Sequence, residues 1–352
     1  MPKEVSHWVL AERTLDLIEP GPARSAIEAH PHFYYLGAII YDSPYYAFGV
    51  RNTDAFLSVV SRLHGVEAED TFEPYRGFAR SYDYEIPPEA LSFFAGALTH
   101  YSGDVVFHPF VNHFSGKYDD NDPRERARAQ GRHRGLEGLM DIYFSSIFAH
   151  DTGHSTRMGI GAGLRNRGRL RRTLDALSER REMIEEVVGR FYWSEAMDIP
   201  VWDLLRRHAQ IQRLFFKRLL GIPITIAGGM IGGGLWVVAA TFYRSGIRRR
   251  ARKDPETTLP FFSSPVTFTH PNTGDVVKGS VEDLAARMTT MGADLINSYQ
   301  KLSVRGEAVR FLRNENGLSL EYGCDAALAP DPTHFSTNQS IRDLCRSPFR
   351  AT

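Results

Sequence analysis

The sequence predicts an all-α protein, a bundle of many helices with a few short strand or hairpin segments near the C-terminus. Three observations favour this class. Apolar residues recur at helical spacing in successive segments, proline and glycine separate those segments, and polar side chains repeat every four residues in two of them. Strand-like patterns occur only in 255–280 and around 315–323.

The composition is that of a folded globular protein. The chain of 352 residues is 42% hydrophobic and 24% charged, as is usual for such proteins. Its 42 basic and 42 acidic residues balance, so no overall attraction to nucleic acid or to an anionic membrane is expected. Two cysteines, Cys324 and Cys345, are too few for a disulfide scaffold. The 13 histidines are more informative, because imidazole is a ligand of zinc and related metals.

Helices account for most of the first 150 residues. Ser6 is expected to cap the first of them. A buried apolar segment, 36–41, ends at Asp42, which suits either a turn or a metal ligand. His64 lies in the last turn of a short helix, where it suits either the helix dipole or a ligand. The expected helices cover 6–18, 23–30, 56–65, 89–109 and 132–149, with polar loops at 76–88 and 117–134.

The segment 93–113, FFAGALTHYSGDVVFHPFVNH, carries His100, Asp104 and His108 four positions apart. On a helix with about 100° per residue, these side chains fall within a sector of roughly 80°. Two imidazoles flanking a carboxylate can serve two neighbouring metal ions, or they can form a solvated stripe or a satisfied polar core. Pro109 follows the last of them and is expected to kink or end the helix.

A second stripe of the same kind lies on the next helix. His133, Glu137 and Asp141 are again four positions apart. Two such stripes in one chain favour metal binding over chance. His7, in the first turn of the first helix, is by itself an ordinary exposed histidine or a further ligand.

The second half of the chain contains further helices and one unusual apolar stretch. The stretch 222–242, from Ile222 to Phe242, is uncharged and of a length that could span a bilayer. Its five glycines dilute the hydrophobicity, so a buried core helix or a membrane-facing loop is favoured over a spanning helix. The other helices are expected at 165–190, 201–220 and 280–302, the last capped by Ser280.

Residues 1–145 resemble the zinc-dependent phospholipase C family. The resemblance is carried, in the family's order, by SHWVLAERTLDLI, LGAIIYD, RLHG, ALTHYSGDVVFHP and HRGLEGLMD. The later TFTHPNTGDVVKGSVEDL is similar to a segment of uncharacterised bacterial members. The resemblance implies a helical domain over 1–302, with a motif-bearing core at 1–150 and a C-terminal extension, 303–352, of unknown role. It also implies a bacterial hydrolase of lipid metabolism.

The resemblance further implies which residues bind zinc and act in catalysis. Asp42 would act on the water molecule that attacks the substrate, either by orienting it or by removing its proton. Asp141 would lie behind one of the metal ligands and orient it. The ligands implied are Asp42, His64, His100 and Asp104 for the first zinc, His108, His133 and Glu137 for the second, and His7 with Asp104 for the third.

The number of zinc ions, two or three, stays open. In the secreted members of the family an N-terminal tryptophan completes the third site, whereas six residues precede His7 here. The first 21 residues lack the uncharged apolar core of a secretory signal, so a cytoplasmic protein, with membrane association through 222–242 left open, is expected.

The expected function is metal-dependent hydrolysis of a phosphodiester, most specifically of a phospholipid. A zinc nuclease of the same fold is an alternative, although the neutral charge and the lack of a basic-aromatic stripe argue against a nucleic-acid partner. The other alternative is a non-catalytic protein that uses this scaffold to bind lipid or a partner.

Overall fold

The computed structural model describes residues 3–47, 53–65, 70–83, 85–151, 169–192, 200–215, 247, 250–251, 253–303, 317–325 and 332–336. Its regular structure is helical apart from one small two-stranded sheet in the described part, as predicted. The α-helices are α1 Glu4–Thr14, α2 Pro22–Ala29, α3 Pro31–Gly37, α4 Thr53–His64, α5 Glu73–Arg80, α6 Pro88–Ser115, α7 Pro123–Asp151, α8 Arg169–Ala176, α9 Arg181–Tyr192, α10 Val201–Phe215, α14 Pro255–Thr258, α15 Pro260–Ser263 and α16 Val281–Ser303. The described residues also include the short 3-10 helices η1 Leu15–Leu17, η2 Ile40–Tyr46 and η4 Ser178–Arg180.

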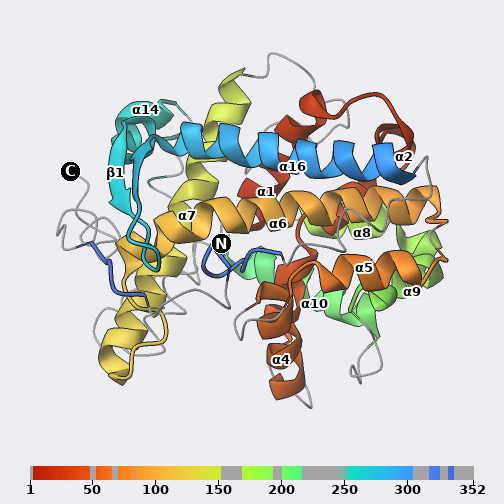
Figure 1. The fold of residues 1–352 in the computed structure, drawn as a ribbon, viewed down its shortest axis with the longest axis horizontal. Helices are drawn as coiled ribbons and strands as arrows, with labels where there is room; N and C mark the ends of the chain where they lie inside the picture. The colour runs from red at the N-terminus through yellow and green to blue at the C-terminus, as the bar shows by residue number, and fades with distance from the viewer. Residues whose placement is uncertain are drawn as a thin grey trace.

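Helix α6 is the central element of the fold. It runs through the middle of the molecule with α16 alongside it, and it also packs against α1, α2, α3 and α7 (Figure 1). Nearly every residue from Ala90 to Ser115 is buried, which is typical of a helix surrounded by other elements. Polar side chains on α6 are therefore held inside the protein rather than on its surface.

Pro109 was expected to kink or end this helix, and it does not end it. Helix α6 continues past Pro109 to Ser115 and stops before Gly116, whose φ is 97°. A proline removes one helix hydrogen bond, but burial of the following turns outweighs that loss here. Phe110 and Phe114 are buried and pack against Phe261, with ring centroids 5.8 and 5.2 Å apart.

Helix α1 begins earlier than predicted. Its N-cap is Lys3 rather than Ser6, so the predicted cap is wrong. Ser6 instead lies in the first turn, where its amide and hydroxyl both donate to Asp141 Oδ1, at 2.8 and 2.6 Å. A carboxylate from α7 thus shares the amide of Ser6 with the carbonyl of Lys3, which lies 3.0 Å from the same nitrogen.

Three segments predicted as loops or single helices differ in the structure. The expected polar loop at 76–88 begins within α5. The charged loop at 117–134 is mostly the start of α7, because Pro123 suits a first helical position and Asp122 Oδ1 accepts from Arg124 N at 2.8 Å. The predicted helix at 165–190 is two helices, α8 and α9, joined through η4.

The segment 255–280, expected to be extended with strand-like patches, begins instead with the short helices α14 and α15 and ends in a hairpin. Strands β1 (Val266–Thr269) and β2 (Val276–Gly279) pair antiparallel, with Val266 opposite Gly279. The predicted helix at 280–302 is α16, and Ser280 Oγ accepts from Asp283 N at 3.2 Å, as expected of an N-cap.

The C-terminal extension is described in two pieces. Residues 317–325 form a turn closed by Ser319 N donating to Cys324 O at 2.8 Å, and the structure assigns no strand to them. The stretch 222–242 lies outside the described residues. Among the described residues, no helix is long and apolar enough to cross a membrane.

Two glycines allow α3 to approach α6 closely. A Cβ added at Gly37 would collide with the carbonyl of Phe93, and one added at Gly96 would collide with the carbonyl of Tyr34. We therefore expect Gly96→Ala to lower the free energy of unfolding by at least about 2 kcal/mol, as overpacking does.

Urea denaturation of the zinc-free protein measures this loss. The matched control is Gly292→Ala in α16, where the added Cβ would meet nothing nearer than Thr14 Cγ2 at 3.5 Å. That variant should keep or slightly increase stability, since alanine favours a helix over glycine by roughly 1 kcal/mol. Equal stability of the two variants would contradict the close approach.

Candidate metal centre

The stripe predicted on α6 lies in the interior of the protein. His100, Asp104 and His108 are each at most 1% exposed, so neither a solvated stripe nor an exposed ion pair describes them. His100 Nε2 lies 3.1 Å from Asp104 Oδ2, one turn away on the same helix.

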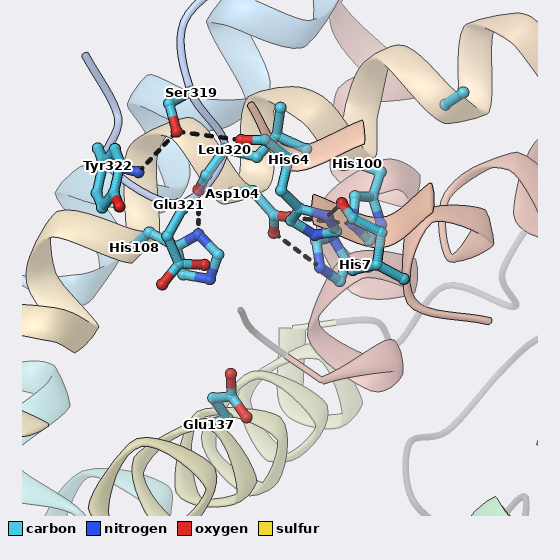
Figure 2. Close-up of polar contacts among 12 residues, drawn as sticks. His7, His64, His100, Asp104, His108, Glu137, Ser319, Leu320, Glu321 and Tyr322 are labelled. Atoms are coloured by element: carbon cyan, nitrogen blue, oxygen red, sulfur yellow. Dashed lines mark hydrogen bonds and ion pairs between the residues drawn. The ribbon is translucent and has the colours of Figure 1, made fainter. Parts of the chain in front are cut away.

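Imidazoles from two other helices meet Asp104. His7, from α1, places Nε2 3.3 Å from Asp104 Oδ1, and His64, at the end of α4, places Nε2 3.6 Å from Asp104 Oδ2. The ring of His7 also stacks on that of His100, with centroids 3.9 Å apart. Figure 2 shows the three imidazoles and the carboxylate facing one another.

Asp42 reaches the same cluster from η2. One of its carboxylate oxygens lies within 4.8 Å of a nitrogen of His7 and of a nitrogen of His100. These two nitrogens also lie within 4.8 Å of each other. His64, His100 and Asp104 form a second group under the same limit. The two groups share His100, so five residues from four elements form one continuous cluster.

A third group lies where α6 meets α7. Ligand atoms of His108, His133 and Glu137 lie within 4.8 Å of one another, and His133 Nε2 is 2.8 Å from Glu137 Oε1. Glu137 projects from α7 toward the space below His108 (Figure 2). His133 and Glu137 of the second predicted stripe therefore face the first.

The histidines are held in an orientation that suits metal binding. The Nδ1–H of His64 donates to Val60 O at 2.8 Å, that of His100 donates to Ala38 O at 2.9 Å, and that of His108 donates to a carbonyl of the C-terminal extension. Fixing Nδ1 in this way leaves Nε2 as the unprotonated ligand atom.

The residues present fit zinc. Within the described part of the chain, no hydrogen-bond partner serves His100 Nε2, Asp42 Oδ1, either nitrogen of His7 or either oxygen of Asp104. Buried polar atoms normally have partners, and a buried charge without compensation is costly. A divalent cation would satisfy all of them, and nitrogen and oxygen ligands of this kind are those that zinc accepts.

Burial keeps most of the imidazoles neutral. It lowers the pKa of His7, His64 and His133 to about 4. Burial opposes charge on Asp104 and His100 as well, but their mutual attraction lowers the pKa of Asp104 and raises that of His100. Metal ligation needs neutral imidazoles and ionised carboxylates, and these shifts favour those forms for His7, His64, His133 and Asp104.

Asp42 differs from the other carboxylates of the cluster. Burial, supported by repulsion from Asp104 and Glu4, raises its pKa well above the ordinary value. Such a carboxyl group holds a proton more readily than Asp104 does.

The backbone of η2 that carries Asp42 is fixed by a buried network that the sequence did not reveal. Ser43 Oγ lies 3.0 Å from His208 Nδ1, and His208 Nε2 donates to Glu4 Oε1 at 2.9 Å. Although burial opposes its charged form, the bond from His208 lowers the pKa of Glu4 to about 2. His208 stands alone in α10, without a spaced partner that could have indicated this role.

Asp141, expected to orient a ligand, accepts two hydrogen bonds from Ser6. Through its two bonds to Ser6 it fixes the residue that precedes His7. Its role in orienting a metal ligand stays a prediction.

Partly exposed residues lie beside the buried cluster. Tyr45 contacts the His64 ring at 5.9 Å between centroids, and Tyr118 contacts the His133 ring at 5.0 Å. Arg134 Nη1 lies 3.5 Å from Glu137 Oε2, and its guanidinium lies 5.6 Å from the Tyr45 ring centroid. Arg134 was expected on a solvated loop. Its position directly after the proposed ligand His133 was the one sequence feature that could have indicated a place beside the site.

A family model described as zinc dependent phospholipase C matches residues 6–200, more than half of the chain. No curated protein and no solved structure gives a significant match.

The lowered histidine pKa values predict how stability depends on pH. Below the ordinary value of 6.5, the unfolded chain takes up protons on His7, His64 and His133, whereas the folded chain does so only near a pKa of about 4. The unfolded state then binds more protons, so the stability of the zinc-free protein should fall as the pH decreases through this window.

Urea midpoints of the zinc-free protein, taken across this window, test the prediction. His7→Asn removes one of the three imidazoles and should make the fall shallower. A midpoint that stays constant or rises on acidification would show that these imidazoles are not held neutral.

Proposed function

The chain belongs to the zinc-dependent phospholipase C family, and we propose that it hydrolyses the phosphodiester of a phospholipid to a phosphomonoester and diacylglycerol. The observation that carries this proposal is the buried cluster of imidazoles and carboxylates, whose ligand atoms gather in three overlapping or adjacent groups. A cluster of this size exceeds what a single structural zinc needs, which is four ligands.

The proposed first zinc is held by Asp42, His64, His100 and Asp104, the second by His108, His133 and Glu137, and a third by His7 with Asp104. The closeness of His7, Asp42 and His100 supports a place for His7 in the cluster. Zinc supplies positive charge that polarises the phosphodiester and lowers the pKa of a water molecule at the site.

The protein's own groups have separate tasks in this proposal. Asp42, with a carboxylate oxygen close to nitrogens of His7 and His100, orients the attacking water and takes its proton. Arg134 keeps its charge, because neighbouring Tyr118 and Glu137 raise its pKa against the effect of burial. Its guanidinium can therefore pair with a phosphate oxygen beside Glu137.

Substrate would reach the cluster past its partly exposed neighbours. The ligand side chains themselves are almost fully buried, whereas Tyr45, Tyr118, Arg134 and Glu321 are only partly so. These residues interact electrostatically with one another. An amphipathic pair of tyrosines beside an arginine suits a ligand with a charged head and an apolar body.

The proposal predicts that His100→Ala lowers bound zinc and abolishes hydrolysis, because His100 belongs to two of the ligand groups. Elemental analysis and a phosphodiester assay measure the two effects. His113→Ala is the matched control on the same helix, since His113 donates to His334 O at 2.8 Å and lies outside every ligand group. Full activity with all zinc retained in His100→Ala would refute the assignment.

The substrate class is tested with phosphatidylcholine vesicles and single-stranded DNA in parallel. We expect release of diacylglycerol and no cleavage of the DNA. Cleavage of DNA alone would identify a nuclease, and zinc binding without turnover of either substrate would identify a non-catalytic binding protein.

A further inference from the structure

The turn formed by residues 317–325, here called the C-terminal strap, lies beside the metal centre. It belongs to the C-terminal extension and is outside the region that the family model matches, 6–200. In Figure 2 it passes above His108, with Ser319 and Leu320 next to His64 and with Glu321 next to His108.

Two residues of the strap contact two different metal-binding histidines. The carbonyl of Leu320 accepts from His108 Nδ1, while the amide of the same residue donates to His64 O at 2.9 Å. Ser319 Oγ also donates to His64 O, at 3.1 Å. The strap therefore connects a histidine of the first zinc group to a histidine of the second.

The strap is itself held firmly by α6. Asn112 Nδ2 donates to Glu321 O at 2.9 Å, one turn beyond His108, and Leu318 N donates to the hydroxyl of Tyr101 at 2.8 Å.

The α4–α5 connection holds the other end of the strap. Asp70 Oδ1 accepts from Gly317 N at 3.0 Å, and Thr71 Oγ1 donates to Leu318 O at 2.8 Å. With both ends fixed, the Leu320 carbonyl is held in place before any metal binds.

Pro109 and Gly323 explain why the strap fits there. Pro109 cannot donate to the carbonyl of Val105 four residues earlier, and Gly323 lies directly against that carbonyl. Gly323 has a φ of 67°, and a Cβ added to it would collide with Val105 O and lie 2.6 Å from Pro109 Cγ. The turn therefore needs glycine both for its conformation and for its approach to α6.

We propose that the C-terminal strap is a positioning element of the metal centre, which fixes the Nδ1–H tautomer of His108 through the carbonyl of Leu320 and holds His64 through its backbone. Such outer-shell bonds typically change metal affinity 10–100-fold. The inference rests on the metal centre of the proposed function and needs no particular substrate.

Gly323→Ala in the full-length, zinc-loaded protein tests the proposal. Because the added Cβ pushes the turn away from α6, we expect the zinc bound through His108 to transfer to a chromophoric chelator at least about tenfold faster. The melting temperature of the zinc-free protein should change no more than in the control. The zinc ion that transfers first from Gly323→Ala should be the same ion that the Glu137→Gln variant fails to bind.

The matched control is Gly274→Ala. Gly274 also has a positive φ, 77°, but its added Cβ would meet only the side chain of His334, at 3.1 Å. Zinc transfer from this variant should match the wild type. Asn112→Leu, which removes the bond to Glu321 O, gives a second and milder displacement, and it decides the question if Gly323→Ala does not fold.

Zinc transfer at the wild-type rate from both variants would overturn the proposal. The proposal would also be overturned if zinc transfer became faster only in proportion to a lower melting temperature of the zinc-free protein. The strap would then stabilise the fold without positioning the metal ligands. If the wild type binds zinc but hydrolyses no diester, the proposed function fails while the strap keeps its role. A wild type that takes up no zinc overturns both.

Discussion

The buried carboxylate of Asp104 is the constraint on which the site depends. It contacts imidazoles from α1, from α4 and from its own helix, and none of these groups reaches water. A carboxylate in such a place is tolerated only when cations or donors surround it closely. Each of these helices must therefore pack so that its histidine faces Asp104, and the fold and the ligand geometry become a single requirement.

The sequence predicts those parts of the site that repeat along one element. His100, Asp104 and His108 share a helical stripe, as do His133 and Glu137, and their spacing alone placed them on common faces. His7, Asp42 and His64 lie on other elements, and no spacing rule links residues so far apart in the chain. They were predicted as ligands only through the family resemblance. The structure brings all eight to one region; their binding of zinc stays a prediction.

Other features could not be predicted, for definite physical reasons. The acceptor for His108 is a backbone carbonyl, which any residue type supplies, so no side chain marks it. His208 acts through tertiary contacts to Ser43 and Glu4, far away in sequence. Pro109 was expected to kink or end α6 because local propensity favours that, whereas the helix continues past it, with Phe110 and Phe114 packed in the core.

The strap also bears on the order in which the site can be completed during synthesis. Every proposed zinc ligand has been synthesised once α7 has been made, but the carbonyl that fixes His108 lies 212 residues beyond His108 in the chain. Closing so long a loop is entropically slow. If the strap has the proposed role, a nascent chain that includes α7 but not yet the strap carries all the metal ligands and still binds metal weakly. Tight zinc binding would then distinguish finished chains from those that stop before residue 317.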